Sequence, residues 1–374
     1  MSSSPPRLTP LTTPQTYPGC GSQCAYVNAI HSTTEHALSR HYKIDTSFLP
    51  FSARAAFVPL FLDDETKSFL ASCTPNRCID TLATFLRVLL SVTDVNALLF
   101  RGGMFVLSTA QARTLLLSST SSASASSTRP LNVLLDVGAG DGNVTSRFSP
   151  LFSNIEATEI SWAMVLRLRL KGFRARGVTD LSHRTFPNAG AYDCVSLLNL
   201  LDRCDEPLAM LKNAARLAAK HDGTGRVIIA LVLPFSDFVE EGARRRPPKV
   251  PLEMGGARCG DGATFELSLA AFIERVLPSA GLVLERLSRV PYLCRGDARR
   301  AYYVLSDAIM VLRPIIAKNH QSSYRSTSGD DDHVICEEEE NTLLRRNNIG
   351  GDGNDNHDDG GGSSGGPPAI HIRL

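Results

Sequence analysis

The strongest constraint on the fold is a glycine-rich turn that directly follows an apolar strand. Residues 134–142 read Leu-Leu-Asp-Val-Gly-Ala-Gly-Asp-Gly, and the apolar run that enters the turn predicts a buried strand over Val133–Val137. A helix is expected directly after the turn, which is the context that a glycine-rich nucleotide loop requires. Gly138 and Gly140 would let the backbone approach a ligand closely, and Gly142 would let the helix begin tight against the strand.

After this turn the chain alternates strands and helices, which predicts a parallel sheet with helices on both faces. Further strands are predicted at Ile155–Thr158, Phe173–Val178, Tyr192–Leu198, Arg226–Leu233, Val283–Arg289 and Tyr302–Leu312, and helices at Ala163–Lys171, Pro207–Ala219 and Leu267–Leu277. A polar insert containing Arg244–Pro248 follows the fifth strand. The last two strands have no helix between them, so we expect an antiparallel hairpin at one edge of the sheet.

The residues around the glycine turn favour a cationic ligand. Their spacing is GxGxG, whereas dinucleotide-binding proteins have GxGxxG and place a pyrophosphate at the helix N-terminus. Asp136 puts a negative charge beside the turn, which suits a sulfonium amino acid and disfavours a pyrophosphate. Glu159 ends the next strand, where a carboxylate commonly accepts hydrogen bonds from ribose hydroxyls. We therefore predict S-adenosylmethionine as the cofactor, bound by Asp136, Gly138, Gly140 and Glu159, with Thr179 near the adenine.

These features predict an α/β fold of class I, the Rossmann-like methyltransferase fold, with a seven-stranded, mostly parallel sheet over residues 131–314. Residues 41–117 carry helical periodicity, clearest at Ile79–Leu90 and Ala110–Leu117, and predict a small helical N-terminal subdomain. A Ser-rich linker at 118–130 would join the two parts. We expect residues 1–40 and the acidic, Gly-rich tail at 315–374 to be disordered, because neither can bury enough apolar surface.

Composition argues against several classes of protein. The net charge is +1, whereas proteins that hold a phosphate backbone usually carry a basic excess. The apolar runs are too short to span a bilayer, and no transmembrane segment is predicted. The nine cysteines are scattered without paired CxxC spacing, so we expect free thiols, a reducing compartment and no metal site. The expectation is a cytoplasmic monomer.

Two polar residues follow the fourth predicted strand. Ligands of open α/β sheets bind outside the carboxyl ends of the strands, so Asn199 and Asp202 are candidates to surround a transferred methyl group. Both are also good helix N-cap residues, and capping explains their spacing equally well. The Asn/Asp-Pro-Pro-Tyr/Phe motif of adenine- and glutamine-methylating enzymes does not follow this strand. Tyr302 and Tyr303 should point to opposite faces of the last strand, so only one of them can line the site.

At these residues the sequence resembles the DREV family, the methyltransferase-like protein nine group of protein-histidine N-methyltransferases. The similarity continues upstream through residues 93–107 and covers roughly residues 45–314. It rests on LLDVGAGDG, IEATEIS, SLLNLLDRCDEPL, GRVIIALVLPF, RVPYLCRGD and YYVLSDAIMVL, in the order that the family has them. The resemblance implies methylation of the pros nitrogen of histidine, at His-x-His motifs of protein substrates. Carried over by motif, it places Asn199, Asp202, Tyr292 and Tyr303 around the target imidazole.

The chemistry of histidine methylation is consistent with those residue types. With a pKa of about 6.5, free imidazole is mostly neutral at pH 7 and already a nucleophile, so the enzyme must chiefly orient it. A carboxylate that accepts the distal N–H would fix the tautomer and stabilise the imidazolium product. Asp202 is the candidate for that role.

The chain departs from the family pattern in three places. It has Phe-Arg-Gly-Gly-Met at 100–104 where members commonly read Gly-Arg-Gly-Ser-Met, and Arg295 stands where an acidic residue is usual. The family's apolar N-terminal segment is missing, so a cytoplasmic location is expected, although the resemblance also allows association with endomembranes or mitochondria.

Other functions remain open at this point. One is a methyltransferase that acts on a small molecule or on RNA, with Arg244–Lys249 as a local basic contact. Another is a non-catalytic scaffold that binds S-adenosylmethionine, although the intact glycine turn and Glu159 argue against decay of the site. The GxGxG spacing disfavours a nicotinamide-dependent oxidoreductase. None of the nine histidines lies in a His-x-His pair, so self-methylation receives no support.

Overall fold

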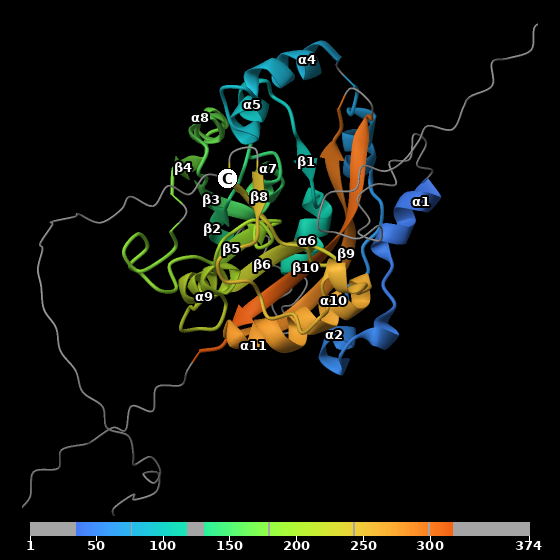
Figure 1. Ribbon diagram of the computed structural model, residues 1–374. Helices are drawn as coiled ribbons and strands as arrows, with labels where there is room; N and C mark the ends of the chain where they lie inside the picture. Colours follow the sequence, from blue (N-terminus) through green and yellow to red (C-terminus); the bar gives the residue numbers. More distant parts are fainter. Residues whose placement is uncertain are drawn as a thin grey trace, which may run out of the picture. The chain divides into compact units, whose positions relative to one another are not determined.

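An eight-stranded sheet forms the centre of the structure, a computed structural model that describes residues 35–75, 77–117, 131–178, 180–241, 244–297 and 300–316 (Figure 1). The strand order is β1-β9-β10-β6-β5-β2-β3-β4. The strands are β1 Met104–Phe105, β2 Leu131–Val137, β3 Phe152–Thr158, β4 Arg174–Arg176, β5 Cys194–Leu198, β6 Arg226–Val232, β9 Leu282–Arg295 and β10 Tyr302–Pro314.

The pairing confirms the predicted class I arrangement. Strands β4, β3, β2, β5 and β6 run parallel to their neighbours, and β10 is antiparallel to both β6 and β9. The last two strands therefore form the expected hairpin. The predicted number of seven strands is wrong by one, because Met104 and Phe105 pair with Cys294 and Leu293 and add β1 beyond β9. A two-residue strand has no detectable periodicity, so only the tertiary pairing defines it.

Helices cover both faces of the sheet, as predicted. On the first face, here called face A, sheet residues such as Leu135 and Val195 pack against helices α2 (Phe51–Ala55), α9 (Pro207–Ala218), α10 (Phe265–Ala271) and α11 (Leu277–Ser279). On face B, residues such as Leu134 and Ala157 pack against helices α6 (Thr109–Leu117), α7 (Thr145–Phe148) and α8 (Trp162–Leu170). Strands β5 and β6 are buried almost throughout, because both of their faces are covered.

The N-terminal region packs into the same cores as the sheet. It contains α1 (Glu35–Ser39), α3 (Asp64–Ala71), α4 (Arg77–Leu86) and α5 (Val92–Leu98), besides α2, β1 and α6. Tyr42, Val106 and Leu115 share a hydrophobic cluster with the sheet residues Leu134 and Ile309. The predicted boundary between a helical subdomain and the catalytic domain stays a prediction, and the described residues on its two sides share one core.

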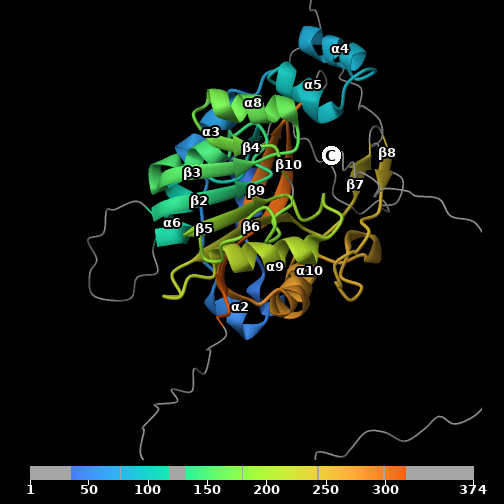
Figure 2. The ribbon, with the colours of Figure 1, turned by 90° about the vertical axis from the view of Figure 1, so that its left-hand side faces the viewer.

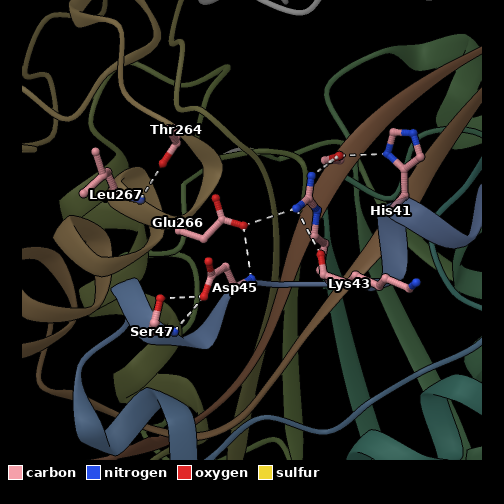
Figure 3. A network of polar contacts seen from close by, with 9 residues as sticks. His41, Lys43, Asp45, Ser47, Thr264, Glu266 and Leu267 are labelled. Atoms are coloured by element: carbon pink, nitrogen blue, oxygen red, sulfur yellow. Dashed lines mark hydrogen bonds and ion pairs between the residues drawn. The ribbon is translucent and has the colours of Figure 1, made fainter.

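A polar network fastens the start of this region to face A (Figure 3). Arg289 of β9 donates hydrogen bonds to the carbonyl oxygen of Lys43 (3.0 Å), to Ser306 Oγ (3.1 Å) and to Glu266 Oε1 (3.4 Å). Ser306 Oγ also lies 2.8 Å from His41 Nδ1. Burial and the nearby arginines lower the pKa of His41 to about 4, so its ring is neutral at pH 7.

The polar insert after β6 contains secondary structure of its own. Its first part forms a hairpin of β7 (Val239–Glu241) and β8 (Arg244–Arg246), which lies at the right-hand side of Figure 2. Acidic and basic residues face each other across this hairpin: Arg245 pairs with Glu240 (4.0 Å) and Arg246 with Glu241 (3.3 Å). Opposite charges on paired strands stabilise such a ribbon. Which charges face each other depends on the strand register, which the sequence alone does not give.

The cysteines differ from expectation at one position. Cys73, Cys78, Cys194, Cys204 and Cys294 are free thiols, but Cys259 is disulfide-bonded, so the prediction of free thiols throughout is wrong there. Within the described ranges, no group of three or more His, Cys, Asp or Glu side chains is arranged to hold a metal ion. None of the helices in these ranges is long and apolar enough to cross a membrane.

Candidate active site

The glycine turn follows β2 and is held against β3. The backbone N–H groups of Gly138 and Ala139 both donate to the carbonyl oxygen of Thr158, at 2.9 and 3.0 Å. Gly140 and Gly142 have φ values of +55° and +74°, which side-chain-bearing residues rarely adopt. A Cβ on Gly142 would lie 2.7 Å from Leu168 Cδ2, whereas a Cβ on Gly140 would meet no atom within 4 Å. Gly142 thus serves packing against α8, and Gly140 presents bare backbone to open space.

Glu159 lies beside the open part of this turn. Its Oε2 accepts a hydrogen bond from the N–H of Gly140 (2.9 Å), and its Oε1 accepts from the N–H groups of Ile160 (2.8 Å) and Ser161 (3.1 Å). Burial raises the pKa of Glu159 above its ordinary value, although these three N–H groups oppose the shift. The side chain is therefore a buried hydrogen-bond acceptor at the carboxyl end of β3.

Asp136 lies behind the turn. One of its carboxylate oxygens accepts from Ser196 Oγ of β5 (2.6 Å) and the other from Thr145 Oγ1 of α7 (2.5 Å). Burial raises its pKa to about 6. These two bonds join β2 to β5 and α7, so Asp136 braces the base of the turn. Thr179, the predicted adenine contact, lies outside the described residues.

Asp94 joins the site although sequence reasoning did not select it. Its Oδ1 accepts from Ser161 Oγ (2.5 Å) and its Oδ2 from Ser91 Oγ (2.7 Å), and its charge contributes to the raised pKa of Glu159. Asp94 belongs to α5, which packs against α8 at the top of the ribbon in Figures 1 and 2. The only sequence signal for Asp94 was the resemblance to the family over residues 93–107, and that resemblance assigned no role to this region.

Asn199 directly follows β5, the strand that pairs with β2. Its φ of +56° turns the chain sharply, and its N–H donates to the carbonyl oxygen of Ala230 (3.0 Å). Its Nδ2 donates to Asp307 Oδ2 at 2.7 Å. Asp307 is 0% exposed, in the middle of β10. Sequence reasoning missed it, although a lone carboxylate in the apolar run Tyr302–Leu312 was a usable signal.

Asp202 completes a cluster of buried oxygens with Asn199 and Asp307. One oxygen of Asp202 pairs with Arg203 Nη2 at 3.4 Å. Within the described residues, Oδ1 of each of the three cluster members is buried without a hydrogen-bond partner. Burial raises the pKa of both carboxyl groups, and the charge of Asp202 raises that of Asp307 further. Unsatisfied buried acceptors are costly, so a bound group that donates hydrogen bonds would stabilise the cluster.

The helix-capping interpretation of Asn199 and Asp202 is not what the structure shows. The next helix, α9, has Glu206 as its N-cap residue, and no side chain caps it. The backbone carbonyl of Asp202 instead accepts the N–H of Phe238 at 3.0 Å, which joins the end of β5 to the insert.

The two predicted tyrosines lie on the same sheet face as Asp307. Tyr292 pairs with Leu305 and Tyr303 with Cys294, so alternation from Asp307 places both side chains on face B. The hydroxyl of Tyr292 contacts Met104 Sδ, and burial raises the pKa of Tyr292 well above its ordinary value. The hydroxyl of Tyr303 donates to Asp297 Oδ2 at 2.7 Å.

Tyr302 faces the other way, as the predicted alternation requires. It packs against a hydrophobic cluster that contains Phe69 and Phe105. Of the two adjacent tyrosines, Tyr303 is therefore the one on the face of the oxygen cluster.

Two of the residues that depart from the family pattern, Gly103 and Arg295, lie against each other. Arg295 donates to the carbonyl oxygen and to Oγ of Ser72, both at 2.8 Å, at the C-terminus of α3. A Cβ on Gly103 would lie 3.1 Å from Arg295 Cδ. The arginine thus holds α3 to β9, and the glycine leaves room for it.

The turn and the oxygen cluster belong to one site. A Cβ on Gly138 would lie 2.9 Å from Leu200 Cδ1, so the segment between Asn199 and Asp202 packs directly on the glycine turn. Strands β2 and β5 are neighbours and parallel, which brings their carboxyl ends to the same edge. The arrangement therefore suits group transfer from a ligand on the turn to a hydrogen-bond donor at the cluster.

Comparison with solved structures finds distant similarities. Magnesium protoporphyrin IX methyltransferase from Synechocystis PCC 6803, crystallised with S-adenosylmethionine, is 18% identical with a TM-score of 0.31, over 50% of this chain and 71% of that one. The N-methyltransferase NodS from Bradyrhizobium japonicum WM9, in complex with S-adenosylhomocysteine, is 16% identical with a TM-score of 0.32, over 55% and 85%.

These structural similarities are too distant to assign a family, so the family assignment rests on the comparison with family profiles. The profile of the DREV methyltransferase family matches residues 41–314, which include the N-terminal region, the glycine turn and the oxygen cluster. This match extends over well more than half of the 374 residues. The chain belongs to the DREV methyltransferase family.

Proposed function

We propose that this DREV methyltransferase transfers a methyl group from S-adenosylmethionine to the pros nitrogen of histidine in protein substrates with His-x-His motifs. The observation that carries the proposal is the cluster of three buried oxygens, on Asn199, Asp202 and Asp307, that have no partner in the described residues. A histidine ring that enters this cluster brings the N–H donor that the oxygens need.

The residues of the turn fit the proposed methyl donor. Gly140 leaves its backbone open on the side where a Cβ would otherwise stand, and the carboxylate of Glu159 lies next to it as an acceptor for ribose hydroxyls. The buried carboxylate of Asp136 contributes negative charge behind the turn. When bound there, S-adenosylmethionine supplies an electrophilic methyl group on a sulfonium.

Asp202 is the candidate catalytic residue. Its free oxygen accepts the N–H of the distal ring nitrogen, which fixes the tautomer and leaves the lone pair of the pros nitrogen available for attack. The same carboxylate stabilises the positive charge that the ring gains on methylation. It then takes up the distal proton, so that the product leaves as neutral methylhistidine.

Asn199 and Asp307 hold the geometry. The 2.7 Å hydrogen bond from Asn199 Nδ2 to Asp307 fixes the rotation of the amide and leaves Oδ1 of Asn199 as an acceptor for the ring or a neighbouring peptide group. Tyr292 and Tyr303 are proposed to flank the ring from the same sheet face. Ring orientation of this kind supplies a large part of the rate when the nucleophile needs little activation.

The test is methyl transfer from labelled S-adenosylmethionine to a peptide with alternating His and Ala, followed by hydrolysis and identification of the product. We expect pros-methylhistidine with the full chain and none with a Gly138→Arg variant, whose side chain would collide with Leu200. Cofactor binding without transfer to the peptide would refute the histidine specificity. The small-molecule, RNA and scaffold functions would then replace it.

A further inference from the structure

Helix α4 and the turn that follows it carry apolar side chains on two sides. Ala83 of α4 is 0% exposed, and α4 packs against α5. Four other apolar side chains of this segment are between 48 and 85% exposed: Leu82, Phe85, Val88 and Leu89. Because Leu82, Phe85 and Leu89 are spaced by three and four residues, they lie along one outward side. A surface helix normally has one apolar face, so a second one indicates a binding surface.

Helix α8 extends this apolar surface. Three of its side chains, spaced by four residues along one side, are between 51 and 75% exposed: Trp162, Leu166 and Leu170. The hydrogen bond between Ser161 Oγ and Asp94 Oδ1 (2.5 Å) fastens the first turn of α5 to the residue before Trp162. Helices α4, α5 and α8 lie at the same end of the ribbon in both views (Figures 1 and 2). We call these seven exposed side chains the apical patch.

The charged side chains around the apical patch are unequal in sign. Four exposed basic residues lie on or directly after α4 and α8: Arg87, Arg169, Lys171 and Arg174. The described segments 78–101 and 162–176 contain two acidic residues, and both are engaged: Asp80 pairs with Arg101, and Asp94 accepts from two serines. Neither acid is exposed. The whole chain has a net charge of +1, so this end concentrates positive charge beside apolar surface and suits an anionic partner.

We propose that the apical patch docks this enzyme on the surface of a bilayer that contains anionic lipids. Leucine and phenylalanine side chains enter the boundary of the acyl chains, tryptophan lies at the level of the headgroups, and arginine and lysine bind the headgroup anions. A partner helix would need an apolar groove, whereas the patch lies on the outer sides of helices. With ten residues, α4 is too short to cross the bilayer, so the docking is peripheral.

Docking here would hold the cofactor site close to the bilayer. Ser161, which is bonded to Asp94 of α5, also donates its N–H to Glu159 at 3.1 Å. The inference goes beyond the proposed methyl transfer and does not depend on the identity of the methyl acceptor.

The test mixes the full chain with vesicles of phosphatidylcholine alone and of phosphatidylcholine with phosphatidylserine. Trp162 is the only tryptophan of the chain, so its fluorescence reports on the patch itself. We expect binding to the anionic vesicles, with a shift of the Trp162 emission to shorter wavelength and quenching by lipids brominated in their acyl chains. Arg87→Gln should weaken binding to the anionic vesicles about fivefold, the usual contribution of one basic side chain, and leave binding to neutral vesicles unchanged.

A pair of double variants separates the patch from exposed apolar surface in general. Phe85→Asn with Leu89→Asn should lower the affinity for anionic vesicles by about tenfold or more, because two large apolar side chains no longer enter the lipid. The matched control is Phe48→Asn with Phe51→Asn, at positions that are 58 and 85% exposed at the end of the ribbon where α2 lies (Figure 1). The control should keep the wild-type affinity for vesicles, and both double variants should keep the affinity for S-adenosylmethionine, which shows that they fold.

Three results would overturn the proposal. They are the absence of binding to anionic vesicles, an equal loss of binding in the two double variants, and binding that leaves the Trp162 emission unchanged. The patch would then have another occupant, a protein partner or the acidic segment of this chain at residues 337–340. None of these results bears on histidine methylation, because the vesicle assay contains no methyl acceptor.

Discussion

Two single-methyl substitutions in the glycine turn should separate folding from cofactor binding. Gly140→Ala and Gly142→Ala each place a methyl group on a residue with positive φ, +55° and +74° respectively. That backbone conformation costs an alanine about 1–2 kcal/mol. Their surroundings differ, however, because the new Cβ at Gly140 meets no atom within 4 Å and the one at Gly142 lies 2.7 Å from Leu168 Cδ2 and 3.2 Å from the Phe173 ring.

The magnitudes follow from these distances. Forcing a methyl group into a filled site costs a further ~1–3 kcal/mol, so Gly142→Ala should lower the free energy of unfolding by about 2–5 kcal/mol. Gly140→Ala should lower it by only about 1–2 kcal/mol, and less if the loss of unfolded-state entropy offsets part of the strain. The binding effect is expected in the opposite order, since the methyl group on Gly140 occupies the open side of the turn.

Urea unfolding of both variants measures the first quantity, and calorimetric titration with S-adenosylmethionine measures the second. We expect Gly140→Ala to fold and to lose most of its affinity, and Gly142→Ala to be the less stable variant but to bind when folded. Wild-type affinity in Gly140→Ala would refute the view that the cofactor approaches the bare backbone at this position. Equal stability of the two variants would refute the packing argument at Gly142.

Three further outcomes are expected. Asp202→Ala should abolish turnover while S-adenosylmethionine still binds, and loss of both would mark Asp202 as structural. His41 has a pKa of about 4 in the folded chain and about 6.5 in the unfolded chain, so between these values the unfolded state binds more protons. The free energy of unfolding should therefore fall as the pH decreases through this range, by at most about 3 kcal/mol at pH 4. Urea unfolding at several pH values should show a shallower decline for His41→Asn than for the wild type. Gly103→Ser should displace Arg295 from Ser72 and speed proteolysis of the N-terminal region, and an unchanged rate of proteolysis would refute this role of the contact.

Local sequence patterns determined most of the scaffold. Apolar runs located the seven main strands, because strands covered on both faces are apolar along their length. Period-3.6 hydrophobicity located the helices between them, because each helix buries one face. The glycine turn and Glu159 were equally readable, since each directly follows a buried strand, and parallel neighbours bring such ends together. Asn199 and Asp202 were found for the same reason, although their spacing alone left capping open.

Tertiary structure decided how distant segments complete the site. The bond between Asn199 and Asp307 joins positions 108 residues apart, and the bond between Ser161 and Asp94 joins positions 67 apart. Strand β1 exists only through its pairing with β9. Such contacts depend on strand register and on the packing of the N-terminal region over the sheet. Strand register and this packing leave no periodic pattern in the sequence. Asp307, for example, has the same neighbours in sequence whether or not the side chain of Asn199 reaches it.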